Sequence, residues 1–76
     1  MRNEAKIEMR KRARMVKGLV NLLNNDAEYI YADANDFDLL ALSVSVEEIK
    51  DTIQKIIDNV TELEYIAYLY KRDESC

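Results

Sequence analysis

Apolar residues recur with a helical period through the first third of the chain. At 100° per residue, six apolar residues of the segment 3–24 fall within one stripe of a helical wheel; they are Ala5, Met9, Val16, Leu19, Val20 and Leu23. Asn3 can cap this segment, and Glu4 lies in its first turn, where the helix dipole favours an anion. The pattern predicts an amphipathic helix over residues 3–24. Arg12 lies inside the apolar stripe, so we expect its stem to pack there while its charged head reaches a carboxylate.

The next two segments carry patterns typical of β-structure. Residues 28–33, EYIYAD, and residues 37–44, FDLLALSV, are rich in side chains that favour a pleated surface. Residues 34–36, AND, lie between them and have the chemistry of a turn. Together the three segments predict a β-hairpin.

A second helical signal begins at Ser45. Ser45 and Glu48 match a capping box, and Val44 and Ile49 occupy the positions of a hydrophobic staple around it. The apolar side of this helix has helical spacing and consists of Val46, Ile49, Ile53, Ile56, Ile57 and Val60. We expect the helix to end near Asn59.

The segment 62–71, ELEYIAYLYK, fits two structures. Its tyrosines and continuous apolar run suit a strand. Thr61 and Glu64, however, form another capping box, and the apolar spacing also matches a helix. We favour the strand, which gives an α+β fold in the order α-β-β-α-β with a small antiparallel or mixed sheet. The alternative is a mostly α-helical chain in which residues 62–72 are helical.

Length and composition indicate a single small domain over residues 1–76, with a basic helix at 3–24 and an acidic α+β part at 26–72. A chain of this size buries only about 60% of its unfolded surface. One cysteine and no histidine exclude a disulfide framework and a zinc site, and we expect no metal and no cofactor. Oligomerisation is the remaining source of stability, so we expect a homodimer or a partner-bound protein.

Charge is divided sharply along the chain. Residues 1–25 hold seven basic and two acidic groups, a net of +5, whereas residues 26–76 hold four basic and thirteen acidic groups, a net of −9. The predicted basic helix face consists of Lys6, Arg10, Lys11, Arg14 and Lys17. Such a face is typical of a solvated helix, of a surface that binds an acidic protein, or of a surface that binds nucleic acid. No known nucleic-acid-binding fingerprint accompanies it.

The acidic part of the chain predicts a second surface. We expect no calcium loop, because Phe37 is not an oxygen ligand and Asp38 stands where an EF-hand requires glycine. The simple interpretation is a turn solvated by carboxylates, with tyrosines packed in the core. The alternative is a partner-binding face made of Asp33, Asp36, Asp38, Glu47, Glu48, Tyr29, Tyr31, Tyr68 and Tyr70. Tyrosine is enriched in protein interfaces, and the carboxylates would suit a basic partner.

The function that these features favour is regulation by binding. The chain has no histidine for general-base chemistry and no phosphate-binding glycine loop, so we expect no enzymatic activity. It has no apolar run of membrane-spanning length, and we expect a soluble, cytoplasmic protein in a reducing compartment. We expect a protein partner, for example a nucleic-acid-binding enzyme that a phage or mobile-element regulator inhibits. The alternatives are a dimeric nucleic-acid-binding regulator that uses the basic helix, and a subunit of a larger assembly.

Overall fold

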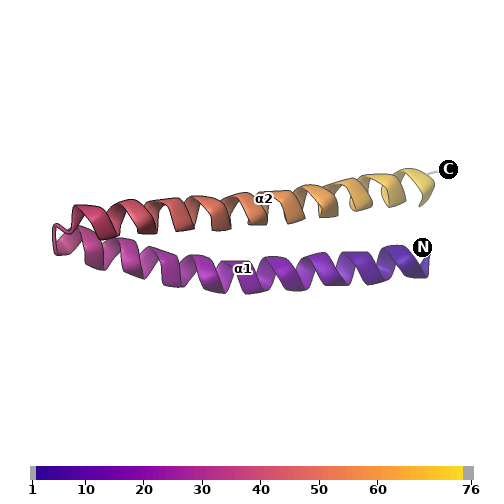
Figure 1. The fold of residues 1–76 in the computed structure, drawn as a ribbon. Helices are drawn as coiled ribbons and strands as arrows, with labels where there is room; N and C mark the ends of the chain where they lie inside the picture. Colours follow the sequence, from indigo (N-terminus) through magenta and orange to yellow (C-terminus); the bar gives the residue numbers. More distant parts are fainter. Residues whose placement is uncertain (1, 75–76) are drawn as a thin grey trace.

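The chain folds into a long helical hairpin (Figure 1). This computed structural model describes residues 2–74, and the side chains of residues 2–71. Helix α1 spans Asn3–Asn35 and helix α2 spans Leu39–Glu74, with residues 36–38 as the loop between them. The helices run antiparallel, so the start of α1 and the end of α2 lie at one end of a rod of 58 × 16 × 13 Å. Its radius of gyration is 17.2 Å, against about 11 Å for a compact domain of this length.

The predicted α+β fold is wrong, because residues 2–74 contain no strand. Residues 28–33 continue α1, residues 37–44 form part of the loop and the start of α2, and residues 62–71 are helical, as in the alternative that we favoured less. The β preference of tyrosine and isoleucine is weak and depends on the packing around them. No proline or glycine interrupts these segments, so the helices continue through them.

The predicted helix ends are also wrong. Helix α1 passes Asn24 and α2 passes Asn59 without a break. Asn3 is the first residue of α1 rather than its cap, which is Arg2 without a side-chain hydrogen bond. Ser45, the predicted N-cap, is buried inside α2. The residue that caps α2 is Asp38, whose Oδ1 accepts a hydrogen bond of 3.1 Å from the backbone N–H of Ala41.

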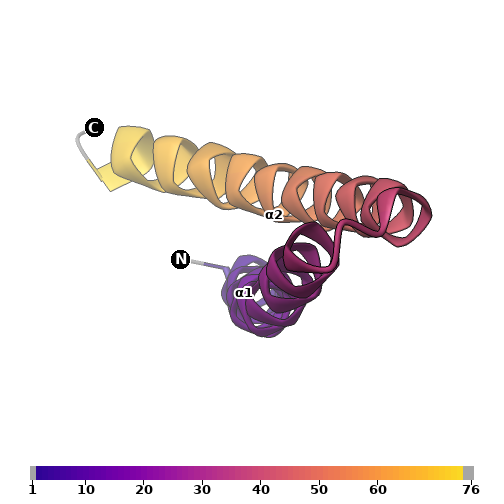
Figure 2. The same cartoon turned by 90° about the vertical axis from the view of Figure 1, so that its left-hand side faces the viewer.

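The two helices pack through a heptad repeat. In each helix, a series of residues with reduced exposure recurs at alternating steps of four and three, the spacing of positions a and d in a coiled coil. In α1 these positions are Ala5, Met9, Arg12, Val16, Leu19, Leu23, Asp26, Ile30 and Asp33. In α2 they are Leu42, Ser45, Ile49, Thr52, Ile56, Asn59, Leu63, Ile66 and Tyr70. Seen from the loop end, the helices diverge toward the open end of the hairpin (Figure 2).

Polar side chains occupy regular positions within this apolar seam. The hydroxyl of Thr52 donates a hydrogen bond of 2.8 Å to Asp26, and that of Ser45 donates one of 2.6 Å to Asp33. Asp26 retains only 7% and Thr52 only 4% of its accessible surface. Sliding one helix past the other by a heptad would place Leu19 opposite Thr52 and would separate Asp33 from Ser45. The pairs therefore favour the observed register of the hairpin, as single polar residues do in coiled coils.

Arg12 supplies the third polar contact of the seam. Its Nε donates a hydrogen bond of 2.8 Å to Glu8, and its Nη1 donates one of 3.0 Å to the side-chain oxygen of Asn59. This confirms the expectation that Arg12 packs in the apolar stripe and reaches a carboxylate. The hydrogen bond from Arg12 lowers the pKa of Glu8, and it outweighs a weaker opposing effect of desolvation. The charges of Arg12 and Lys11 act in the same direction as the hydrogen bond.

Removing the hydroxyl of Thr52 tests the polar seam. We expect Thr52→Val to lower the free energy of unfolding by about 1–3 kcal/mol, because it leaves the buried carboxylate of Asp26 without its donor. Urea denaturation at one fixed protein concentration measures the change. Thr61→Val is the matched control on the exposed side of α2, and it should change stability by less than about 0.5 kcal/mol. Equal effects of the two substitutions would contradict a structural role for the Asp26–Thr52 pair.

Candidate interaction surfaces

The loop between the helices has a backbone shape that favours glycine. The N–H of Asp38 donates a hydrogen bond of 3.0 Å to the carbonyl of Asp33, and the N–H of Phe37 donates one of 3.2 Å to the carbonyl of Ala34. This pair of bonds is the Schellman motif, which places the residue after the helix cap in the left-handed region. Phe37 occupies that position with φ of 53°. An L-residue with a side chain carries a cost of roughly 1–2 kcal/mol there.

The charges at the same loop are also unfavourable for the helix. The C-terminus of α1 carries the negative end of the helix dipole and favours cations. Its last turn contains no basic residue, and it carries Asp33 followed by Asp36 at the cap. The preference for glycine at the left-handed position and the preference for cations at the helix C-terminus are thus both violated within a few residues. Such violations concentrate at functional sites, which makes this loop the first candidate.

Large apolar side chains project into solvent at this end of the rod. Phe37 is 87% exposed and Leu40 is 85% exposed, so neither contributes appreciably to packing within the chain. Asp36 and Asp38 lie on either side of Phe37. We call residues 36–40, DFDLL, the loop tip. It combines exposed apolar side chains with neighbouring carboxylates.

The predicted acidic and aromatic residues do not form one surface. Asp36 and Asp38 lie in the loop tip, but Asp33 is turned into the seam. Glu47 and Glu48 are exposed on α2, where Glu47 lies 3.8 Å from the ammonium of Lys50.

The four tyrosines of that prediction divide between the two ends of the rod. Tyr29 and Tyr31 are exposed on the loop half of α1. Tyr68 and Tyr70 lie near the open end of the hairpin, with Tyr68 exposed and Tyr70 half-buried. The predicted face is therefore divided along the length of the rod, and only its loop part remains a candidate site.

The predicted basic residues all lie exposed on the N-terminal half of α1. Arg10, Lys11, Arg14 and Lys17 occupy heptad positions b, c and f, which face away from α2. Lys6 lies at position e, beside the seam. Among the described side chains of residues 2–71, no ion pair involves any of these five residues. They form a basic outer face at the open end of the hairpin.

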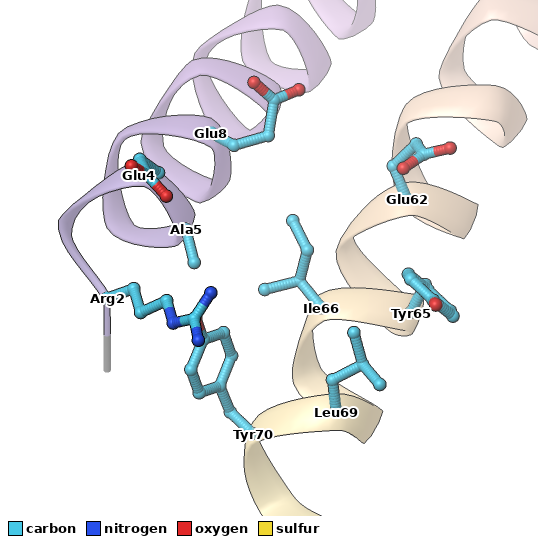
Figure 3. A pocket seen from close by; sticks show the side chains of 9 residues that line it. All are labelled: Arg2, Glu4, Ala5, Glu8, Glu62, Tyr65, Ile66, Leu69 and Tyr70. Carbon is cyan, nitrogen blue, oxygen red and sulfur yellow. The ribbon is translucent and has the colours of Figure 1, made fainter.

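A cleft opens between the helices at the end opposite the loop (Figure 3). Its volume is about 510 Å³, and Ala5, Ile66 and Tyr70 line it together with carboxylates such as Glu8 and Glu62. The cleft forms where the helices diverge and where the small side chain of Ala5 faces α2. Within residues 2–71, no group of three histidine, cysteine or acidic side chains is placed to hold a metal ion.

Comparison with known proteins identifies no relative of this chain. No protein family, curated protein or solved structure matches it. Neither helix, over its described residues, is long and apolar enough to cross a membrane.

Phe37 and Leu40 are the residues of this site that sequence reasoning missed. We interpreted them as members of a strand, because an apolar run of this composition suits a pleated surface. The sequence does contain a feature that indicates the loop. Two segments with helical spacing meet at DFD, where a helix stop would normally contain glycine.

Replacing Phe37 by glycine should stabilise the hairpin. We expect Phe37→Gly to raise the free energy of unfolding by about 1 kcal/mol, because glycine adopts the left-handed conformation without the steric cost. The thermal midpoint should rise by roughly 4–8 °C. Phe37→Ala removes the ring but keeps the Cβ atom, so its stability should stay close to that of the wild type. Equal stabilisation by both substitutions would contradict backbone strain at this position.

Proposed function

We propose that this chain is a non-enzymatic regulatory protein that binds a partner protein through its loop tip. Phe37 is the anchor of this contact and enters an apolar pocket of the partner. The carboxylates of Asp36 and Asp38 meet basic groups at the rim of that pocket. The proposal rests above all on one observation, the exposed phenylalanine in a left-handed conformation.

The energetics of Phe37 support this assignment. An exposed aromatic side chain gains little from the fold that carries it, and this one adds backbone strain. Buried in a partner, the same ring would remove a large apolar area from water. Interface anchors of this kind often contribute 2 kcal/mol or more to binding. The feature that weakens the isolated hairpin is therefore the one that would strengthen a complex.

The charge of the loop half indicates what kind of partner fits. Residues 18–55 hold eight acidic and two basic groups, a net of −6. A basic protein surface would meet this half of the rod with favourable long-range attraction. Proteins that bind nucleic acid have such surfaces. We propose that the hairpin inhibits a protein of this class by covering its phosphate-binding surface with the carboxylates of the loop half.

Photo-crosslinking from the loop tip identifies the partner and tests the contact. A variant that carries benzoylphenylalanine at position 37 would be expressed in the native cells, where illumination crosslinks it to its partner. The partner identified in this way would then be purified, and its affinity for the unmodified hairpin would be measured by calorimetry. We expect Phe37→Ala and Phe37→Gly each to weaken binding at least about tenfold, equivalent to 1.4 kcal/mol. Phe37→Gly would then weaken binding while it stabilises the free hairpin, a combination that general unfolding does not produce.

Two controls accompany this measurement. Tyr68→Ala removes an exposed aromatic ring at the opposite end of the rod and should leave affinity unchanged. Asp36→Asn with Asp38→Asn should weaken binding and reduce its dependence on salt, while asparagine at position 38 preserves the helix cap. The proposed anchor is wrong if Tyr68→Ala weakens binding as much as Phe37→Ala does.

The basic outer face supports a second candidate, a nucleic-acid-binding regulator. Lysine and arginine side chains without described ion pairs are available to neutralise phosphates. The face extends from Lys6 to Lys17, roughly 17 Å at 1.5 Å per residue, and the rod then becomes acidic. A long polyanion lying along the rod would meet that acidic half, which is why we place this function second.

Binding of short single-stranded and duplex oligonucleotides at low salt tests the second candidate. If the basic outer face binds nucleic acid, Lys11→Ala with Lys17→Ala should weaken binding. The slope of the logarithm of affinity against the logarithm of salt concentration should fall by an amount equivalent to about two phosphate contacts. Lys50→Ala with Lys55→Ala changes the net charge equally on α2 and serves as the control. No retention of either oligonucleotide by the wild-type protein would exclude this function.

A further inference from the structure

The hairpin exposes far more surface than a folded chain of its mass. Its accessible surface is 6208 Å², whereas a compact monomer of 8.9 kDa exposes about 4,800 Å². The excess is therefore about 1,400 Å² per chain. Two chains that buried this excess against each other would share an interface of about 2,800 Å², which falls in the range of permanent homodimers.

An apolar strip runs along one side of the hairpin. Heptad position e of each helix borders the seam, and over residues 13–34 of α1 and 46–67 of α2 every such position is apolar and exposed. The strip consists of Ala13, Val20, Ala27 and Ala34 in α1 and of Val46, Ile53, Val60 and Ala67 in α2. It extends over roughly 32 Å at 1.5 Å per residue.

The two halves of the strip lie on the same side of the hairpin. In an antiparallel pair of helices, the e positions of both border the seam on one side and the g positions of both border it on the other. The cleft at the open end is lined by Glu8, Glu62 and Leu69, all at position g, and by no residue of the strip. On that other side, Glu48, Lys55 and Glu62 of α2 interrupt the apolar surface.

We propose that the strip is covered by a second copy of this chain, which gives an antiparallel four-helix bundle. Each hairpin places its strip on that of the other, so that the loops lie at opposite ends. The eight strip residues of each chain then form a second apolar layer parallel to the first seam. The loop tip, and Arg10, Lys11, Arg14 and Lys17 of the basic outer face, lie outside the strip. The inference therefore does not rest on the proposed function.

Charge selects the antiparallel orientation. Residues 2–17 and 56–71, the open half, hold eight basic and five acidic groups, a net of +3. The loop half, residues 18–55, has a net of −6. Antiparallel hairpins place each open half beside the acidic loop half of the other chain, whereas parallel hairpins would bring the two acidic halves together.

The distance of each strip residue from the loop, measured along the rod, predicts which residues of the two chains contact each other. Val20 and Ile53 lie almost equally far from Phe37 along their helices, near the middle of the rod. A twofold axis through the middle of an antiparallel dimer places Ile53 on Ile53 of the other chain and Val20 on Val20. In a parallel dimer with the same strip, Ile53 would instead meet Val20.

Single-cysteine variants distinguish these arrangements. With Cys76 replaced by serine, the introduced thiol is the only one in the chain. We expect pure Ile53→Cys and pure Val20→Cys each to form disulfide-linked dimers on mild oxidation. Sedimentation of the unmodified protein should give a dimer, with a thermal midpoint that rises with protein concentration.

Other outcomes overturn the inference. If crosslinks form only when the Ile53→Cys and Val20→Cys proteins are mixed, the dimer is parallel. Monomers at all micromolar concentrations exclude the dimer. Val46→Lys should raise the dimer dissociation constant at least about tenfold, while Val44→Lys, two residues away at position c, should leave it unchanged. Equal effects of these two matched substitutions would show that the strip is not the interface.

Discussion

Two helices can bury only one face of each against the other, and this constraint governs the whole molecule. A third layer is absent from the described residues, so side chains outside the single seam stay at least partly in water. Among the described side chains, Ile66 is the one apolar residue that is buried, and it still keeps 8% of its accessible surface. The polar pairs of the seam give little net stability, since burying charge costs much of what the hydrogen bonds return. What they supply is a defined register for two long helices.

The sequence allowed prediction of helical structure over residues 3–24 and 45–59 and of the place of Arg12, because apolar residues recur with a helical period in both segments. The rest of the fold was hidden by polar residues at seam positions. Asp26 and Asp33 interrupt the apolar pattern of α1, and Ser45 resembles a helix cap although it lies inside α2. Residues of these types are typical of loops and helix caps, and their place in the seam is evident only when the hydrogen-bond partner of each is known. Pairing between distant positions is the information that periodicity alone lacks.

One of the candidate surfaces could be predicted from the sequence and the other could not. The basic face could be located from the sequence, since helical spacing alone places its side chains on the outside of α1. The loop tip could not, because the conformation of Phe37 depends on where α1 stops. The two surfaces lie at opposite ends of the rod, and the apolar strip runs between them along one side. Three separate contacts are thus compatible on one small chain.

The spacing of the polar pairs along the chain also orders the folding of the hairpin. Asp33 and Ser45 are separated by 12 residues, Asp26 and Thr52 by 26, and Arg12 and Asn59 by 47. Closing a short segment costs less chain entropy than closing a long one. We therefore expect contacts to form first beside the loop and to advance toward the open end, with each pair aligning the helices before the next pair forms. Errors of register are rejected early, while few contacts must be broken to correct them.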